Sequence, residues 1–332
     1  MHNKDDIHAL NGMVMMKTIG QYHVMWNDSI VSCTFTPRYQ RQAKGKDKRR
    51  SGSHNGYDNN CPALEPAVGD RVEVDIRDGN GHITSVLPRS SQLSRRSAVP
   101  MPTARAHEQV IAANVDLVVP VIAAAEPPPK WNLLDRYLTA AEANELPAVV
   151  CLTKVDLVKD AAGGLYEPIQ QAVDLYRHIG YRVILVSAVT GEGIDNLAAA
   201  LKGSLSVLVG KSGVGKTSLL NALQPGLGGR VTQVSRLTGK GRHTTTGVQI
   251  FQLDFGGALI DTPGTREFGL WDLPPDELAD YFIEMREYHV KCRFGLGCRH
   301  RDEPGCAVRQ AVMEEKISPQ RYASYLKLLE DI

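Results

Sequence analysis

Apolar and polar residues alternate in four short segments near the start of the chain, and this period of two is typical of half-buried β-strands. The segments are Gln21 to Trp26, Ser29 to Phe35, Arg71 to Ile76 and His82 to Leu87. Turn-forming groups of Asn, Asp and Gly separate neighbouring segments. The pattern predicts that residues 1–88 form a small closed β-barrel.

The pattern changes after residue 107, where continuous apolar runs alternate with helical periodicity. Strands are expected at Leu117 to Ile122, Ala148 to Leu152 and Val183 to Val186, and helices at Leu133 to Asn144, Leu165 to Ile179 and Ile194 to Leu201. This alternation predicts an α/β domain with a mostly parallel sheet and helices on both faces. Two further helices are expected at 274–288 and 319–332.

The chain has 332 residues, of which 42% are hydrophobic and 23% charged, and this length suits two or three globular domains. We expect a barrel at 1–88, a basic linker at 89–107, an α/β domain at 108–270 and a small domain at 271–332. The first ten residues are polar, and no run approaches the roughly 20 apolar residues of a membrane span. Six cysteines in so long a chain do not make a disulfide scaffold. We therefore expect a cytoplasmic protein with no membrane partner.

A strongly basic segment interrupts the expected barrel, although the net charge of the chain is only +1. Arg38 to Arg50 contains seven Lys or Arg and one acid, Asp47, with Tyr39 among them. Such a run is either a solvated loop or a loop that follows a nucleic-acid backbone, and its position between barrel strands favours the second. The linker after the barrel is also basic and has no acid before Glu108.

A phosphate-binding P-loop, G-x-x-x-x-G-K-[ST], lies between an apolar run that ends at Val209 and a helical segment. In such a loop the backbone N–H groups surround the phosphates, Lys216 reaches the β- and γ-phosphates, and the Thr217 hydroxyl ligates Mg²⁺. The sequence therefore predicts a nucleoside triphosphate bound with Mg²⁺. The expected contacts are Gly210, Lys211, Ser212, Gly213, Val214, Gly215, Lys216, Thr217 and Ser218.

The nucleotide base is predicted from a Thr-Lys-Val-Asp stretch that follows an expected strand and matches [NT]-K-x-D. An aspartate in the base plane accepts from the guanine N1–H and 2-amino groups together, whereas adenine offers no such pair of donors. Asp156 is therefore expected to select GTP. A Ser-Ala pair at the end of the next strand fits the short base-contacting motif of GTPases. The residues expected beside the base are Thr153, Lys154, Val155, Asp156, Ser187 and Ala188.

Two stretches downstream of the P-loop complete the expected phosphate and metal contacts. The motif D-x-x-G runs from Asp261 to Gly264, and in it the aspartate holds Mg²⁺ through water while the glycine N–H senses the γ-phosphate. Residues 239–247 are basic and flanked by glycine, and they resemble a mobile switch that brings a threonine to the metal. The choice within the Thr-Thr-Thr run stays open, and Thr245 and Thr246 are the expected contacts.

Three cysteines and one histidine cluster near the C-terminus, at Cys292, Cys298, His300 and Cys306. Three thiolates and one imidazole form a tetrahedral zinc set without an open position, so we expect one structural Zn²⁺ per chain and no catalytic role for it. Buried free cysteines are the alternative, but the residues around the cluster are too polar for a core.

The base-reading motifs precede the P-loop in this chain, whereas Ras-like GTPases place the P-loop first, so the G domain is circularly permuted. In this order the chain resembles the bacterial ribosome small subunit-dependent GTPase A family over nearly all of its 332 residues. The resemblance implies an OB-type barrel, a permuted G domain and a C-terminal zinc domain. It also implies GTP or GDP, the 30S ribosomal subunit and its 16S rRNA as partners, hydrolysis that the subunit stimulates, and a role in late 30S maturation.

The chain departs from the family pattern at three places. These are Thr153, where Asn is commoner, Thr265, where an apolar residue is usual, and the abundant charge of the barrel loop. None of the three removes a nucleotide contact. We expect the protein to be a monomer.

The position after D-x-x-G bears on catalysis, because Ras-like GTPases place there a Gln that orients the attacking water. This chain has Thr265, so we expect slow intrinsic hydrolysis, with His243 of the basic switch as the candidate catalytic residue that positions the water. Two other functions stay open from the sequence. One is a nucleotide-gated RNA-binding scaffold with negligible turnover; the other is a GTP-dependent RNA-modification factor, for which the sequence offers no second active site.

Overall fold

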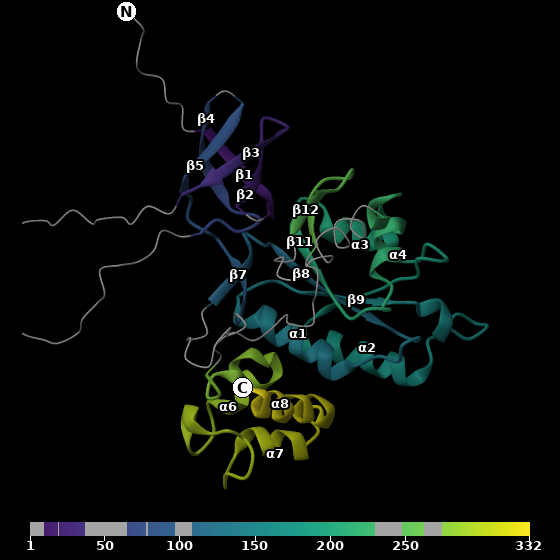
Figure 1. The fold of residues 1–332 in the computed structure, drawn as a ribbon. Coiled ribbons are helices and arrows are strands. Elements are labelled where there is room, and N and C mark those ends of the chain that lie inside the picture. Colours follow the sequence, from purple (N-terminus) through teal and green to yellow (C-terminus); the bar gives the residue numbers. More distant parts are fainter. Residues whose placement is uncertain are drawn as a thin grey trace, which may run out of the picture. The chain divides into compact units, whose positions relative to one another are not determined.

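The computed structural model describes residues 10–18, 20–36, 65–77, 79–96, 108–229, 248–261 and 274–332 (Figure 1). The chain divides into two compact units, Met1–Pro88 and Arg89–Ile332. The basic segment Arg38 to Arg50 lies outside the described residues. Among the helices of the described part, none is both long and apolar enough to cross a membrane.

Five strands form a closed barrel in the first unit, which confirms the predicted barrel. They follow the order β1-β2-β3-β5-β4, with β4 pairing back onto β1, and β3 runs parallel to β5 while the other pairs are antiparallel. The strands are β1 (Leu10–Thr18), β2 (Gln21–Trp26), β3 (Ser29–Phe35), β4 (Arg71–Arg77) and β5 (Asn80–Val86). Val14, Val24, Val72 and Ile83 fill the interior. This strand order is that of an OB-type barrel.

Strand β1 was not among the predicted strands, and a β-bulge explains why. Its pairing with β2 shifts register between Val14 and Met16, and an extra residue of this kind interrupts the alternation of faces. Val14 and Met15 are therefore both buried although they are neighbours. Gly12 lies where the strands approach closely, because a Cβ there would be 2.4 Å from Val24 Cγ1.

A six-stranded, mostly parallel sheet forms the centre of the second unit. Its order is β10-β9-β8-β11-β13-β12, and only β12 runs antiparallel to its neighbour. The strands are β8 (Leu117–Ala123), β9 (Val149–Thr153), β10 (Arg182–Leu185), β11 (Leu205–Val209), β12 (Gln249–Gln252) and β13 (Ala258–Asp261). Every residue of β8, β9 and β11 is buried, which accounts for their continuous apolar runs.

Helices cover both faces of this sheet, as predicted. They are α1 (Trp131–Ala143), α2 (Glu167–Ile179), α3 (Ile194–Leu201) and α4 (Lys216–Leu223). Leu134 of α1 and Val173 of α2 belong to one buried cluster with β9 residues. Leu197 of α3 and Leu219 of α4 belong to another, on the opposite face. The α/β prediction is confirmed.

The segment expected to be a basic linker, 89–107, contains a strand that the sequence pattern does not predict. Residues 92–96 form β6 (Gln92–Arg96), which pairs antiparallel with β7 (Glu108–Ala113). Leu93 and Ser94 of this strand are both buried, and the pairing shifts register between them, so the five residues carry no alternation that could have revealed a strand. Residues 97–107 lie outside the described residues.

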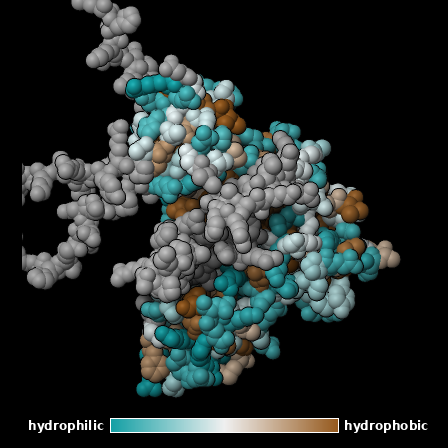
Figure 2. All heavy atoms as spheres, in the orientation of Figure 1, coloured by the Kyte–Doolittle hydropathy of each residue, from teal (hydrophilic) through white to brown (hydrophobic). Residues whose placement is uncertain are grey.

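Short helical elements make up residues 274–332. They are the 3₁₀ turns η3 (Leu278–Tyr281), η4 (Ile283–Met285) and η5 (Gly295–Gly297), and the helices α6 (Arg286–His289), α7 (Ala307–Met313) and α8 (Pro319–Asp331). The prediction of a single helix over 274–288 is wrong, because Phe282 has an extended backbone (φ −105°, ψ 99°) that divides this segment into shorter turns. The helix expected at 319–332 is confirmed as α8. The visible described surface is largely hydrophilic, with small hydrophobic patches (Figure 2).

Candidate functional site

Four of the predicted motifs meet at one edge of the sheet. The Thr-Lys-Val-Asp stretch begins at the end of β9, the Ser-Ala pair follows β10, the P-loop follows β11, and Asp261 ends β13. These strands are parallel, so their carboxyl ends lie on the same side. That edge is where open α/β sheets bind ligands.

The P-loop turns sharply from β11 into α4, and glycine is required at two of its positions. A Cβ on Gly210 would lie 2.5 Å from Val121 O, and Gly215 has a φ of 93°, which an L side chain rarely adopts. The turn leaves the first N–H groups of α4 at its mouth, as an anion site needs. Lys216 Nζ donates to Gly210 O and to Lys211 O (2.9 Å).

Direct contacts join the P-loop to the stretch predicted to read the base, although Thr153 and Val214 are 61 residues apart in the chain. Thr153 Oγ1 donates to Val214 O at 2.6 Å, and both residues are buried. A Cβ on Gly215 would lie 3.8 Å from Lys154 Cε, and Lys154 Nζ donates to Glu126 O. The threonine that stands where Asn is commoner therefore makes a hydrogen bond to the P-loop.

The loop that begins with the Ser-Ala pair is closed by its own hydrogen bonds. Ser187 Oγ accepts the N–H groups of Val189 (3.2 Å) and Thr190 (3.1 Å), and Ser187 N–H donates to the far end of the loop at 3.0 Å. Within the described part of the chain, Ala188 N–H has no acceptor. The loop thus keeps one backbone donor for a ligand, at a half-buried residue.

Several predicted contacts are exposed or lie outside the described residues. Lys211, Ser212, Gly213, Thr217 and Ser218 are exposed around the P-loop, and Asp156 is half-buried in η1 (Val155–Val158). Nothing is described of the Asp261 side chain. His243, Thr245, Thr246, Gly264 and Thr265 lie outside the described residues.

The four predicted zinc ligands come together in the C-terminal region. One ligand atom from each of Cys292, Cys298, His300 and Cys306 lies within 4.8 Å of the others, and all four residues are buried. Cys292 Sγ is 3.9 Å from Cys306 Sγ, and His300 Nδ1 is 3.5 Å and 3.3 Å from these two sulfurs. A tetrahedron with Zn–S bonds of about 2.3 Å has S···S edges of about 3.8 Å. The cluster fits a zinc site.

Burial shifts the pKa values of three of these groups in directions that suit binding of a cation with release of protons. Burial lowers the pKa of His300 to about 4, so its imidazole is neutral and can coordinate. Burial raises the pKa of Cys298 to about 12 and also raises that of Cys306, so both thiols hold their protons until a cation displaces them.

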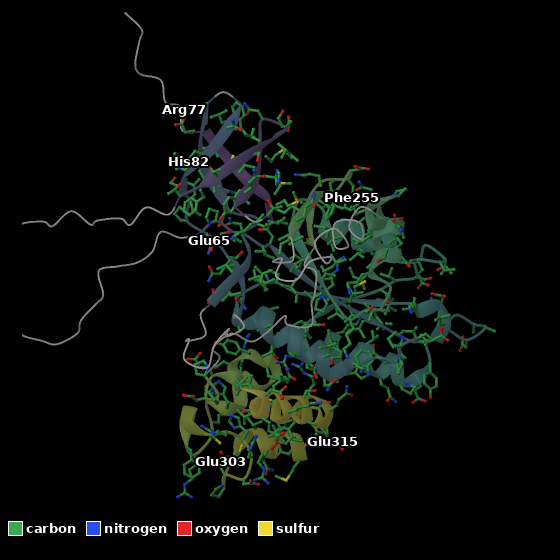
Figure 3. All side chains as sticks on the ribbon, viewed as in Figure 1. Glu65, Arg77, His82, Phe255, Glu303 and Glu315 are labelled. Atoms are coloured by element: carbon green, nitrogen blue, oxygen red, sulfur yellow. The ribbon has the colours of Figure 1, made fainter. Side chains whose placement is uncertain are left out.

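Residues that the sequence analysis did not single out hold the ligand-bearing loop. Tyr322 and Tyr325 of α8 donate their hydroxyls to His300 O (2.5 Å) and Arg299 O (3.2 Å). Both carboxylate oxygens of Glu303, labelled in Figure 3, accept backbone N–H groups of the same loop, at 2.8 and 2.7 Å. His300 itself has a φ of 58°, so the backbone turns at this predicted zinc-coordinating residue. Only the periodic Tyr spacing in α8 could have hinted at this support.

Comparison with known proteins decides the family. Residues 86–271, more than half of the chain, match the model described as RsgA GTPase. A Caldanaerobacter subterraneus subsp. tengcongensis protein named small ribosomal subunit biogenesis GTPase RsgA is 37% identical over 324 residues, covering 97% of this chain and 96% of that protein. The chain belongs to the RsgA GTPase family.

Other RsgA relatives and solved structures agree with this membership. A Pseudomonas aeruginosa protein of the same name is 45% identical over 273 residues, covering 81% of this chain and 76% of that protein. The crystal structure of YjeQ from Thermotoga maritima matches with a TM-score of 0.71 and 32% identity over 97% of this chain and 98% of that one. YloQ, described as a circularly permuted GTPase, matches with a TM-score of 0.68 and 28% identity, covering 100% of this chain and 98% of that chain.

Membership in the RsgA GTPase family makes this chain a GTP hydrolase. The permuted motif order is present in the fold as well, because the strand that leads into the base-reading stretch precedes the P-loop strand in the chain. The family resemblance seen in the sequence and the predicted fold class, a barrel, a permuted G domain and a zinc-site region, are confirmed.

A buried ion-pair network joins the G domain of this RsgA family member to the C-terminal region. Arg321 of α8 is fully buried and contacts Asp135 Oδ1 of α1 at 2.6 Å and both oxygens of Glu284 at 2.6 and 3.0 Å. Tyr176 donates to Asp135 Oδ1 at 2.6 Å, and the guanidinium lies 4.6 Å from the centre of the Phe282 ring. Burial opposes the charge on Arg321, but the two carboxylates outweigh it and raise the pKa of Arg321.

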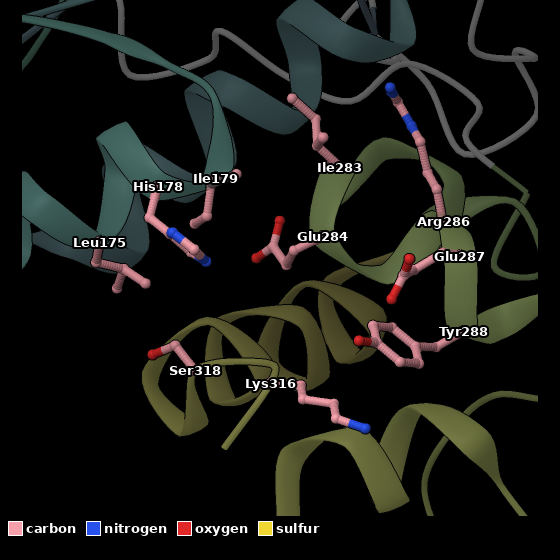
Figure 4. Close-up of a pocket in the computed structure, with 10 residues that line it drawn as sticks. All are labelled: Leu175, His178, Ile179, Ile283, Glu284, Arg286, Glu287, Tyr288, Lys316 and Ser318. Atoms are coloured by element: carbon pink, nitrogen blue, oxygen red, sulfur yellow. The ribbon is translucent and has the colours of Figure 1, made fainter. Parts of the chain in front are cut away.

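A cleft of about 360 Å³ opens beside this network, between the end of α2 and residues 283–318 (Figure 4). Glu284 lines it, as do the apolar side chains of Ile179 and Ile283. None of the residues predicted to contact the nucleotide lines this cleft. It marks the junction between the G domain and the C-terminal region.

Proposed function

We propose that this GTPase binds the 30S ribosomal subunit, through its 16S rRNA, and assists late maturation of that subunit, with hydrolysis stimulated by the subunit. The relatives of known name are called small ribosomal subunit biogenesis GTPases, and two of them are 37% and 45% identical to this chain. Work on ribosomal subunits would place the protein in the cytoplasm, and we propose that it acts as a monomer.

The hydrogen bond between Thr153 and Val214 carries the nucleotide part of this proposal. It fixes a [NT]-K-x-D stretch against a P-loop, so that one ligand can contact Asp156 through its base and Lys216 through its phosphates. The Ala188 N–H, which has no acceptor in the part of the chain that the structure describes, supplies a further donor at the same edge. GTP is the nucleotide whose base offers the donors that Asp156 can accept.

Magnesium would enter with the nucleotide. The Thr217 hydroxyl at the start of α4 and the carboxylate of Asp261 at the end of β13 are the proposed holders, together with Thr245 or Thr246 of the switch. These groups would orient the β- and γ-phosphates, and the Gly264 N–H would sense the γ-phosphate. Bound Mg²⁺ would draw negative charge from the phosphate oxygens, which favours transfer of the γ-phosphoryl group to water.

The two outer parts of the chain are the proposed RNA contacts. The basic segment Arg38 to Arg50 departs from a barrel of OB-type order, whose loops are binding edges in such folds. The C-terminal domain, proposed at 271–332, follows directly from the D-x-x-G motif in the chain. In this proposal the barrel is residues 1–88 and the G domain is residues 108–270. Because the C-terminal domain follows the D-x-x-G motif, a change of the bound nucleotide would move that RNA-facing domain.

Cosedimentation tests the partner directly. The chain, mixed with 30S subunits and a nonhydrolysable GTP analogue, should pellet with the subunits and remain in the supernatant with GDP. Neutralising the basic segment at Lys44, Lys46 and Lys48 should weaken this association and make it less dependent on salt. Equal pelleting with 50S subunits, or none with 30S subunits in any nucleotide state, would overturn the proposed partner.

Replacing Asp156 by Asn should weaken guanine selection, because the amide presents a donor where the carboxylate accepts from two guanine N–H groups. The P-loop contacts should persist, so triphosphate binding is expected to survive with a lower preference for GTP over ATP and a relative gain for XTP. Competition against a fluorescent GDP analogue measures the affinities for GTP, ATP and XTP. An unchanged ranking of GTP, ATP and XTP would show that Asp156 does not read the base.

Replacing His243 by Ala should slow turnover on 30S subunits by roughly 10²-fold or more, the usual scale for a positioned proton-transfer or water-orienting group. GTP affinity should change little, because such a group acts mainly in the transition state. Exposed His178 of α2 provides the control, since its replacement by Ala should leave both quantities as they are. If the His243 variant turns over GTP on 30S subunits at the wild-type rate, groups other than His243 position the attacking water.

A further inference from the structure

An ion pair connects the two base-reading loops of the G domain. Lys159 Nζ lies 2.7 Å from each carboxylate oxygen of Glu192. Lys159 directly follows η1, the turn that carries Asp156, and Glu192 closes the loop that opens with Ser187 and Ala188. One charged contact therefore ties the segment that carries Asp156 to the segment that carries the Ala188 N–H.

The backbone also joins the two segments, at the strand ends from which they leave, because Val186 N–H donates to Leu152 O at 2.8 Å. Val155 N–H donates to Val186 O at 3.4 Å, which is at the long limit of a hydrogen bond. Residues 154–160 and 186–192 are all described, and between them the two 2.7 Å contacts of the ion pair are the shortest polar links. Past the strand ends, the two loops therefore depend on this side-chain contact for their closest polar connection in the described structure.

Both ends of the ion pair are attached to fixed backbone. Lys159 pairs with Leu165 in an isolated antiparallel bridge, and beside it Tyr166 N–H donates to Val158 O at 2.7 Å. Glu192 O accepts the Ser187 N–H at 3.0 Å, and the next residue, Gly193, passes so close to Leu185 that an added Cβ would lie 1.9 Å from its carbonyl oxygen. Loss of the ion pair would consequently shift the two loops, because the backbone beside each residue is held by its own contacts.

We propose that the Lys159–Glu192 ion pair is a positioning device for guanine recognition, which sets the distance between Asp156 and the Ala188 N–H. A guanine base spans the two groups only if they stand at a fixed separation, whereas the phosphate contacts of the P-loop do not depend on it. The pair acts through these two residues and does not itself touch the nucleotide. This inference rests on the proposed binding of GTP at this edge of the sheet.

The expected effect is a moderate loss of affinity and of base selection. The two side chains are 26% and 39% exposed, and partly exposed ion pairs contribute modestly to the energy of the groups they join. Lys159→Met and Glu192→Gln should each weaken GDP binding about three- to fivefold. ADP binding, which depends on the phosphates alone, should weaken less, so the ratio of the two affinities should fall.

The experiment measures displacement of a fluorescent GDP analogue by GDP and by ADP from the full-length protein. The variants are Lys159→Met, Glu192→Gln, the charge swap Lys159→Glu with Glu192→Lys, and the conservative Lys159→Arg. The swap and the Arg variant restore an ion pair and should recover most of the GDP preference. Lys202→Met removes the same charge from an exposed position after α3 and should leave the preference unchanged.

The outcomes separate this inference from the proposed function. A wild-type protein that does not prefer GDP over ADP would contradict GTP binding itself. A wild-type preference that both single variants keep, with the melting temperature also unchanged, would overturn the positioning role. Equal losses of GDP and ADP affinity with a lowered melting temperature, unrescued by the swap, would also overturn it, because the pair would then serve only the stability of the domain.

Discussion

We propose that the cluster holds a structural zinc ion, so replacing Cys298 by Ser is expected to lower zinc binding and loosen residues 274–332. Three soft thiolates and one neutral imidazole surround the site, and a serine hydroxyl is a poor substitute for a thiolate ligand. Structural zinc contributes about 10–16 kcal/mol to folding in zinc-finger peptides, so loss of one ligand should have a large effect. Elemental analysis should show less zinc per chain, and limited proteolysis should cut within this region.

The G domain should be spared, because its motifs lie at the sheet edge and share no ligand with the cluster. GDP affinity of the Cys298 variant should therefore match the wild type. Cys33→Ser is the matched control: Cys33 is equally buried but lies in the barrel, so the same change of atom should leave the zinc content as it was. Absence of zinc from wild-type protein purified without chelator would contradict the account of the cluster.

Replacing Arg321 by Met is expected to lower the free energy of unfolding by about 3–5 kcal/mol, the usual cost of removing one partner from a buried ion pair. Asp135 is fully buried, and its Oδ2 has no hydrogen-bond partner in the described structure. Without the guanidinium, the Tyr176 hydroxyl would be the remaining described partner of this buried carboxylate, and no cation would balance its charge. Chemical denaturation followed by fluorescence and circular dichroism measures the change.

Two further variants show whether burial of the charge is the cause. Arg136→Met breaks the neighbouring ion pair with Asp331, whose side chains are 36% and 42% exposed, and should cost less than about 1 kcal/mol. Adding Asp135→Asn to Arg321→Met removes the more deeply buried of the two carboxylates left without a cation and should recover part of the stability. Equal costs for the Arg321 and Arg136 variants would show that burial of the pair is unimportant.

Sites whose residues lie in one short segment of the chain, such as the P-loop and the Cys/His cluster, could be predicted from the sequence. The P-loop requires a fixed spacing of Gly, Lys and Thr, and the structure has the turn from β11 into α4 that this spacing indicates. The zinc ligands were predicted from residue types alone, and the structure brings them together. Which nucleotide contacts form stays a prediction, because the switch threonines and His243 lie outside the described residues.

Features that depend on contacts between distant segments could not be predicted. Strand β1 was missed because a bulge removes its alternation, and β6 because a register shift between Leu93 and Ser94 does the same. The Arg321 network joins residues 186 positions apart, and no local pattern marks Arg321 as buried. The contact between Thr153 and Val214 also appears only in three dimensions, since it depends on two parallel strands ending at the same edge.

The most direct test of the central claim is multiple-turnover GTP hydrolysis with and without 30S subunits. We expect slow phosphate release from the protein alone and a rate that rises with subunit concentration until it saturates, with GTP and not with ATP. Lys216→Ala, which removes the P-loop ammonium, should abolish the stimulated rate. Turnover that is equally slow with and without subunits would contradict the account and favour a scaffold that binds nucleotide without using it.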